Sequence, residues 1–192
     1  MPTDKKIIEC VPNFSEGRNL DIIDKIASAV KSTQNVKLLN VEPDKDYNRT
    51  VITFAGEPSG VKEAAFNAIS TALELIDMSR QKGEHPRIGA TDVCPIIPVA
   101  NATREECVKL ANELGSEVGE KLGIPVYLYE DAARSEERRN LENIRKGEYE
   151  GLEQKLRDWI PDYGPAEYND KVRKSGATVI GARFFLIAYN VN

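Results

Sequence analysis

Apolar and polar positions change between strand-like and helix-like spacing along the first hundred residues of this chain. The run Ile7-Ile8-Glu9-Cys10-Val11, ended by Pro12, predicts a strand, and residues 20–31 then carry apolar side chains at helical spacing. The alternation continues through a strand over 36–41, a polar loop over 42–48, a strand over 51–54, a helix over 59–77 and a strand over 93–99. This β-α-β-β-α-β order is that of a ferredoxin-like core, in which two helices cover one face of an antiparallel sheet.

The fourth predicted strand contains Pro95 and Pro98. Because proline has no backbone N–H to donate, we expect an edge or irregular strand here rather than a central one. A further helix is predicted to begin after Thr103, whose hydroxyl forms a capping box with Glu106. The pattern then predicts a strand over 126–129, charge-rich helical segments over 133–158 that break at Gly147 and Gly151, and a turn-rich loop over 159–165.

The last segment, residues 178–191, is almost wholly apolar apart from Arg183 and Asn190. It predicts a long terminal strand, and an exposed strand of this kind promotes aggregation unless it is paired or covered. Either the chain is a piece of a larger protein or a partner surface covers the strand, and we favour the first. The fold class is therefore α+β: a ferredoxin-like core with an added helix, an added strand and a C-terminal strand, in which a mixed sheet has its helices on one face.

The composition and net charge of the chain limit the classes of function and partner that we expect. The 192 residues are 41% hydrophobic and 30% charged, which suits one domain with a sizeable core. A net charge of −5 argues against a broad grip on the phosphate backbone of nucleic acid. No apolar run approaches the roughly 18 residues of a membrane span, and the first residues lack the apolar core of a signal peptide. We therefore expect a cytoplasmic protein with no nucleic-acid or membrane partner, and we expect Cys10, Cys94 and Cys107 to be buried free thiols.

The chain has one histidine, His85, within the run Gly83-Glu84-His85-Pro86-Arg87-Ile88-Gly89-Ala90. An imidazole with an ordinary pKa of about 6.5 moves protons near neutral pH, so any histidine-based proton transfer depends on this residue. A metal site built from several histidines is excluded. From the spacing alone, a loop histidine with only a hydrogen-bonding role is the more common interpretation.

Several runs in the same order resemble the N-terminal subdomain of the formiminotransferase family. They are Glu9-Cys10-Val11-Pro12-Asn13-Phe14-Ser15-Glu16-Gly17, the His85 run followed by Asp92-Val93-Cys94-Pro95, Asn48-Arg49-Thr50, Pro125-Val126-Tyr127-Leu128-Tyr129, and Gly181-Ala182-Arg183-Phe184-Phe185-Leu186-Ile187-Ala188-Tyr189-Asn190. The resemblance extends from about residue 7 to the end.

The resemblance implies transfer of the formimino group from N-formimino-L-glutamate to tetrahydrofolate, giving 5-formimidoyltetrahydrofolate and glutamate in histidine degradation. It implies tetrahydrofolate as co-substrate, no metal, a homodimer, and a second subdomain packed sheet against sheet with folate between the two. Residues 1–177 would then be the N-terminal subdomain, and residues 178–192 a connecting strand and the start of a second subdomain absent from this chain. Two alternatives stay open: a non-catalytic folate-binding or assembly module, and a related transferase that uses formylglutamate or 5-formyltetrahydrofolate.

Carried over from the family, His85 is the catalytic base and then the acid for the departing amine. Glu42, Asp92 and Glu84 are carboxylates that can orient it, but the family usually has aspartate at Glu42, and the extra methylene displaces that carboxylate. The candidate clamps for substrate carboxylates are arginines, because the planar guanidinium suits them, and Arg87 ranks first beside His85. The others are Arg49, Arg183 and Arg18.

The family's folate contact falls on a glycine-bounded loop that is longer and more charged here. Its residues are Gly164, Pro165, Ala166, Glu167, Tyr168, Asn169, Asp170, Lys171, Val172, Arg173, Lys174, Ser175 and Gly176. Tyr168 offers a ring for stacking on the pterin or aminobenzoyl group. Lys171, Arg173 and Lys174 either meet a polyglutamate tail or form a solvated run, and the sequence favours neither.

Overall fold

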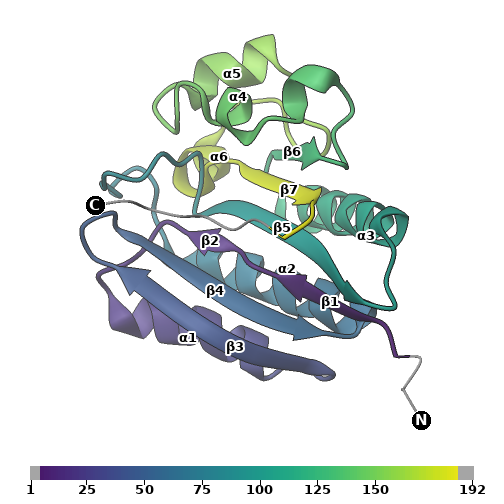
Figure 1. Cartoon of the computed structure of the whole chain (residues 1–192). Coiled ribbons are helices and arrows are strands. Elements are labelled where there is room, and N and C mark those ends of the chain that lie inside the picture. The colour runs from purple at the N-terminus through teal and green to yellow at the C-terminus, as the bar shows by residue number, and fades with distance from the viewer. Residues whose placement is uncertain (1–4, 186–192) are drawn as a thin grey trace, which may run out of the picture.

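The computed structural model describes residues 5–185, which form a seven-stranded mixed sheet with helices packed against it (Figure 1). The strands are β1 (Ile7–Cys10), β2 (Asn13–Phe14), β3 (Val36–Asp44), β4 (Arg49–Gly56), β5 (Thr91–Ala100), β6 (Val126–Glu130) and β7 (Thr178–Ala182). Beginning at the β3 edge, β4 comes next, then β1 and β2 end to end, then β5, β7 and β6. Pairing is antiparallel as far as β5 and parallel for β5–β7 and β7–β6.

Three longer helices and several short ones connect these strands. They are α1 (Leu20–Lys31), α2 (Pro58–Leu75), α3 (Arg104–Glu117), the π-helix η1 (Val118–Leu122), the 3₁₀ helix η2 (Glu136–Arg138), α4 (Leu141–Arg145), α5 (Leu152–Asp158) and α6 (Asp170–Ser175). The α1 helix begins where the Asn19 side chain accepts hydrogen bonds from the N–H groups of Asp21 and Ile22. The α3 helix begins at the expected Thr103 and Glu106 capping box.

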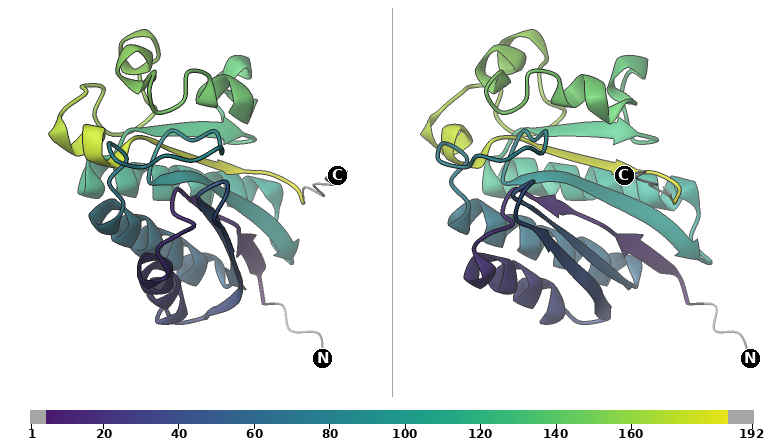
Figure 2. Two further views of the ribbon diagram at one scale, coloured as in Figure 1. Left: turned by 90° about the vertical axis from the view of Figure 1, so that its left-hand side faces the viewer. Right: turned by 60° about the vertical axis from the view of Figure 1, so that its left-hand side comes forward.

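The larger core lies between one face of the sheet and helices α1, α2 and α3. The α2 helix contacts the sheet through small side chains that allow close approach, among them Ala64, Ala65, Ala68 and Ala72. A second core lies on the opposite face at β6 and β7, where Ile144 of α4 and Leu152 and Leu156 of α5 pack against Tyr127, Tyr129 and Val179. In Figure 2, no helix of the described chain covers the opposite face of β1, β3 and β4.

The predicted class is confirmed: the order β3-β4-β1/β2-β5 is that of a ferredoxin-like core, within a mixed α+β sheet. Helices α1 and α2 lie on one face of this core as expected, and α4 and α5 add cover on the other face beyond it. No helix among residues 5–185 is long and apolar enough to cross a membrane.

Three local expectations differ from the structure. The strand with Pro95 and Pro98 is central, because β1 pairs with one side of β5 and β7 with the other. The ladder accommodates the prolines because the Pro95 carbonyl still accepts from Val11 N–H and the register of β1 shifts between Ile7 and Ile8, beside Pro98.

The terminal strand also differs from the prediction, since β7 ends at Ala182 instead of continuing through residue 191. It is not exposed: its five residues are buried between β5 and β6, within the sheet of this domain. The rest of the predicted strand from residue 186 onward lies outside the described residues. The expected polar loop at 42–48 is likewise shorter, because β3 continues to Asp44.

Candidate functional site

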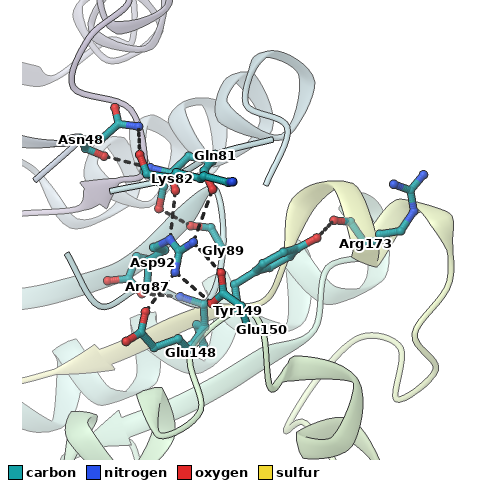
Figure 3. Close-up of polar contacts among 12 residues, drawn as sticks. Asn48, Gln81, Lys82, Arg87, Gly89, Asp92, Glu148, Tyr149, Glu150 and Arg173 are labelled. Carbon is teal, nitrogen blue, oxygen red and sulfur yellow. Dashed lines mark hydrogen bonds and ion pairs between the residues drawn. The ribbon is translucent and has the colours of Figure 1, made fainter. Parts of the chain in front are cut away.

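The segment between α2 and β5, residues 76–90, carries His85 and is held on one side by the turn between β3 and β4. Asn48 contributes to this contact, because its amide donates to the Lys82 carbonyl at 2.8 Å. Its side-chain oxygen also accepts from the N–H of Gly17, in the connection between β2 and α1, at 2.9 Å. The Gln81 side chain in turn donates to the Asn48 carbonyl (Figure 3). Gly83 must be small, because a Cβ there would lie 2.4 Å from the Tyr47 carbonyl oxygen.

On its other side the His85 segment contacts the end of the predicted folate loop. Ala90 N–H donates to the Ser175 carbonyl at 2.7 Å, and Ala177 N–H donates to the Ile88 carbonyl at 2.9 Å. Gly89 and Gly176 face each other in an isolated bridge. The structure therefore brings Ser175 and Gly176 against the histidine motif.

Lys174 of the predicted folate loop also contacts this segment, because its carbonyl accepts from Met78 N–H at 2.8 Å. Residues 170–175 form α6, whose Val172 and Ser175 are buried while Lys171, Arg173 and Lys174 are exposed. Gly164, at the start of the loop, packs against Ile124 and Gly119. A contact between these residues and folate stays a prediction.

Arg87 is buried and engaged by protein carboxylates. Its guanidinium donates to Glu150 at 2.8 and 3.0 Å, to Glu148 at 3.0 Å and to the Gln81 side chain at 3.0 Å (Figure 3). Its carbonyl accepts from Tyr149 N–H at 2.8 Å. Arg87 thus ties the α4–α5 connection to the His85 segment, and a substrate carboxylate would have to displace Glu148 or Glu150 to bind it.

His85 lies beside Asp92 at the start of β5, but the two do not form a hydrogen bond. Nε2 of His85 is 3.7 Å from Oδ2 of Asp92, and this nitrogen is buried without a hydrogen-bond partner among the described residues. The Asp92 oxygens have other donors: Ile88 N–H binds Oδ1 at 3.0 Å, and the Arg145 guanidinium binds Oδ2. Asp92 is 1% exposed, and this burial raises its pKa despite the nearby Arg145.

The electrostatic surroundings keep His85 uncharged. Burial, and then the positive charges of Arg145, Arg49 and Arg87, lower its pKa from 6.5 to about 4, and Asp44 opposes them. Because Arg145 already neutralises Asp92, that carboxylate does little to stabilise an imidazolium. At neutral pH, His85 is therefore a free base with an available nitrogen.

Arg49 is the arginine of the predicted set whose charge acts on His85 and whose Nε makes no hydrogen bond to the described residues. It begins β4 opposite Asp44 of β3, and its Nε is buried with no hydrogen bond to any described residue. Glu42 pairs with Val51, two residues along the same face of the ladder, and its side chain is exposed. The structure thus gathers Arg49, Asp44 and Glu42 at one end of the open sheet face, and the charges of Arg49 and Asp44 act on the imidazole.

Other predicted residues lie elsewhere. Arg183 follows β7, at the far end of that strand from Ala177, where its charge acts on Glu9 and Tyr129. Arg18 is exposed and donates to the carbonyls of Lys45 and Lys82. Glu84 is exposed.

The sequence interpretation missed Arg145. It assigned residues 133–158 to charge-rich helices and gave no member a place in the site. The only signal was the predicted break at Gly147, which has a φ of +86° and turns the chain after α4. That turn places Arg145 against Asp92, and Glu148 and Glu150 against Arg87.

The three cysteines are free and buried, as predicted. Sγ of Cys10 lies 3.4 Å from Sγ of Cys94, and burial raises the pKa of Cys10 and brings that of Cys107 to about 11. Neither Cys10 nor Cys107 is therefore a thiolate nucleophile at neutral pH. Among residues 5–185, no group of three or more His, Cys, Asp or Glu side chains is placed to hold a metal ion, and the expectation that no metal takes part stays a prediction.

The chain has close relatives of known name. The family model of the formiminotransferase domain, N-terminal subdomain, matches residues 7–183. The chain is 54% identical over 189 residues to the formimidoyltransferase-cyclodeaminase of Gallus gallus and 52% identical over 189 residues to that of Dictyostelium discoideum, which covers 97% of this chain but 34% and 35% of those relatives. It is 50% identical over 190 residues to the glutamate formimidoyltransferase of Thermoplasma acidophilum, which covers 97% of this chain and 61% of that relative. The chain thus spans about a third of the first two relatives and less than two thirds of the third.

Proposed function

Because the chain belongs to the formiminotransferase family, matching its N-terminal subdomain, we propose that it supplies the histidine-bearing part of a glutamate formimidoyltransferase. The reaction moves the formimino group of N-formimino-L-glutamate to tetrahydrofolate and releases glutamate. The names of the relatives support this activity, and the coverage of their lengths supports a second subdomain that completes the site.

The observation that carries the proposal is the state of His85: it is uncharged at neutral pH, and its buried Nε2, like the Nε of Arg49, has no hydrogen-bond partner among residues 5–185. Transfer of an amidine carbon between two amines needs one group that takes a proton and gives it back. The attacking nitrogen of tetrahydrofolate bonds to the formimino carbon, and His85 accepts the proton that this nitrogen loses. The imidazolium then donates that proton to the glutamate nitrogen as its bond to carbon breaks.

The low pKa of His85 suits the second step. An imidazolium that forms among three arginines is a strong acid and readily protonates a departing amine. N-formimino-L-glutamate brings two carboxylates, and one of them bound at Arg49 offsets a positive charge beside His85. That neutralisation raises the pKa of the imidazole and strengthens it as a base for the first step.

The folate is proposed to lie across the open face near Gly176, held in part by the loop of residues 164–176, with a second subdomain on its other side. The open face of β1, β3 and β4 supports that arrangement, because no described helix covers it (Figure 2). The expected homodimer and cytoplasmic location stay predictions.

The test is formimino transfer from N-formimino-L-glutamate to tetrahydrofolate by this chain joined to the C-terminal subdomain of a formiminotransferase relative. We expect His85→Ala to lower turnover by about 10²–10⁴-fold. Ser79→Ala, in the same segment, is the matched control, because the Ser79 hydroxyl donates only to Asp77, and its activity should equal that of the unmodified protein. Full turnover by His85→Ala would refute the role of His85, and turnover with N-formylglutamate but not with N-formimino-L-glutamate would reassign the substrate.

A further inference from the structure

Asp92 sits where a histidine-orienting carboxylate would sit, yet it does not bond to the imidazole. Oδ2, the oxygen nearer to His85 Nε2, is also the oxygen that the Arg145 guanidinium binds. Oδ1 is held by Ile88 N–H. The imidazole of His85 and the guanidinium of Arg145 thus compete for one carboxylate oxygen, and in this structure Arg145 binds it.

We propose that Arg145 is a positioning residue that withholds the Asp92 carboxylate from His85, and so keeps the imidazole uncharged with Nε2 free for the reaction. The inference rests on the proposed role of His85 and names a regulator of that same site. The Asp92–Arg145 pair is well placed for this, because Asp92 is 1% exposed and the Arg145 side chain 18% exposed. Water therefore screens the pair little, and its loss releases a buried charge.

The local chain geometry explains how Arg145 reaches Asp92. Arg145 is the last residue of α4, where the buried Ile144 fixes the helix against the sheet. The α4–α5 connection is then fastened to the His85 segment by Arg87, through Glu148, Glu150 and the Tyr149 N–H. Asp92, through Ile88 N–H, and the connection after Arg145, through Arg87, are therefore both attached to the segment that carries His85.

Five charged groups lie around His85 or act on it, and they come from its own segment and four other elements. Arg49 on β4, Arg87 in its own segment and Arg145 on α4 disfavour the imidazolium, while Asp44 on β3 favours it. Asp92 on β5 is the fifth, and it is the group whose effect Arg145 controls. Without Arg145, the Asp92 oxygen is free to accept from His85 Nε2–H, and the imidazolium gains a buried counter-ion.

The chain's single histidine makes this directly measurable, because the imidazole resonances in an NMR titration need no assignment. The pKa of His85 is to be measured in the unmodified chain, Arg145→Gln, Asp92→Asn and the double variant. We expect Arg145→Gln to raise the pKa of His85 by about 1–3 pH units when Asp92 is present, and by clearly less when residue 92 is Asn. Equal shifts in the two backgrounds would mean that Arg145 acts only as a distant charge, and would overturn the proposal.

Two further measurements keep the result interpretable. Arg157→Gln removes the same charge from an exposed pair with Glu153, and it should leave the pKa of His85 unchanged. If Arg145→Gln does not fold, Arg145→Met replaces it in both backgrounds: the pKa of His85 should again rise clearly more with Asp92 present than in Asp92→Asn, and equal rises would overturn the inference. Because no substrate is present, these outcomes are independent of whether the protein transfers a formimino group.

Discussion

Nε2 of His85 and Oδ2 of Asp92 lie 3.7 Å apart, close enough for electrostatic attraction but too far for a hydrogen bond. A histidine this close to a buried carboxylate usually has a raised pKa, because the anion stabilises the imidazolium. Here the pKa is instead lowered to about 4, because burial and three arginines outweigh a carboxylate that Arg145 already neutralises. The site is organised to hold a neutral base.

This lowered pKa predicts how the stability of the protein depends on pH. In the unfolded chain His85 binds a proton near pH 6.5, whereas in the folded chain it does so only near pH 4. Between these values the unfolded state holds more protons, so the free energy of unfolding falls as the pH decreases from 6.5 to 4. The contribution of His85 is at most about 3 kcal/mol over the whole range, and about 2 kcal/mol at pH 5.

Urea unfolding at about pH 7.5 and about pH 5, in the unmodified chain and in His85→Gln, isolates this contribution. The carboxylates with raised pKa values, Asp92 and Glu9, contribute with the opposite sign, but they are common to both proteins. We expect His85→Gln to lose less stability on acidification. An identical pH dependence in the two proteins would contradict the lowered pKa.

The second prediction concerns Asn48, whose hydrogen bonds attach the His85 segment to its neighbours. Asn48→Ala removes the hydrogen bonds to Gly17 N–H and to the Lys82 carbonyl, and it places alanine at a φ of +49°. We expect a loss of about 2–4 kcal/mol in the free energy of unfolding. Asn48→Gly loses the same side-chain bonds without the backbone strain, so it should be more stable than Asn48→Ala by about 1 kcal/mol. Equal stabilities would show that the strain is absent.

The parts of the fold that were predictable from sequence are those in which local signals agree with tertiary packing. The α1 helix spans residues 20–31 as predicted, and the Thr103 and Glu106 capping box forms where the two side chains are spaced for it. The position of β5 was not predictable in this way. Its prolines are local signals for an edge, but the central position results from pairing with β7, about 85 residues later in the chain.

The site shows the same division. His85 is the only histidine of the chain and lies in a glycine-bounded run, so the sequence alone could identify it as a candidate. Arg145 comes from a helix 60 residues later, in a segment whose charges look alike. The turn at Gly147 and the burial of Ile144 place it against Asp92. The break at Gly147 was predictable, but the residue that the turn brings Arg145 against was not. For the same reason, the sequence does not reveal that Glu148 and Glu150 form ion pairs with Arg87.

The contact between the His85 segment and the predicted folate loop gives a third prediction. Gly176 has a φ of +68° and a ψ of −158°, a conformation open to glycine, and a Cβ there would lie 2.2 Å from the Ile88 carbonyl oxygen. Gly176→Ala should therefore lower the free energy of unfolding by more than about 3 kcal/mol. Gly123→Ala is the control: its φ is +61°, but the nearest atom, Lys171 Nζ, is 3.5 Å away and flexible, so the expected loss is about 1 kcal/mol. Thermal unfolding compares the two, and equal losses would mean that the close approach to Ile88 is unimportant.

The last prediction distinguishes the two arginines nearest to His85. Arg49 has an unpartnered Nε and faces the imidazole, whereas the guanidinium of Arg87 is filled by Glu148 and Glu150. In the two-subdomain protein we expect Arg49→Gln to raise KM for N-formimino-L-glutamate by about 10–100-fold, because a charge-assisted hydrogen bond to a substrate carboxylate is lost. Arg87→Gln should instead lower the free energy of unfolding by about 2–3 kcal/mol, because it detaches the α4–α5 connection from the His85 segment. Steady-state kinetics and urea unfolding of both variants are the measurement. A KM effect confined to Arg87→Gln would mean that substrate displaces Glu150, and that Arg87 is the clamp after all.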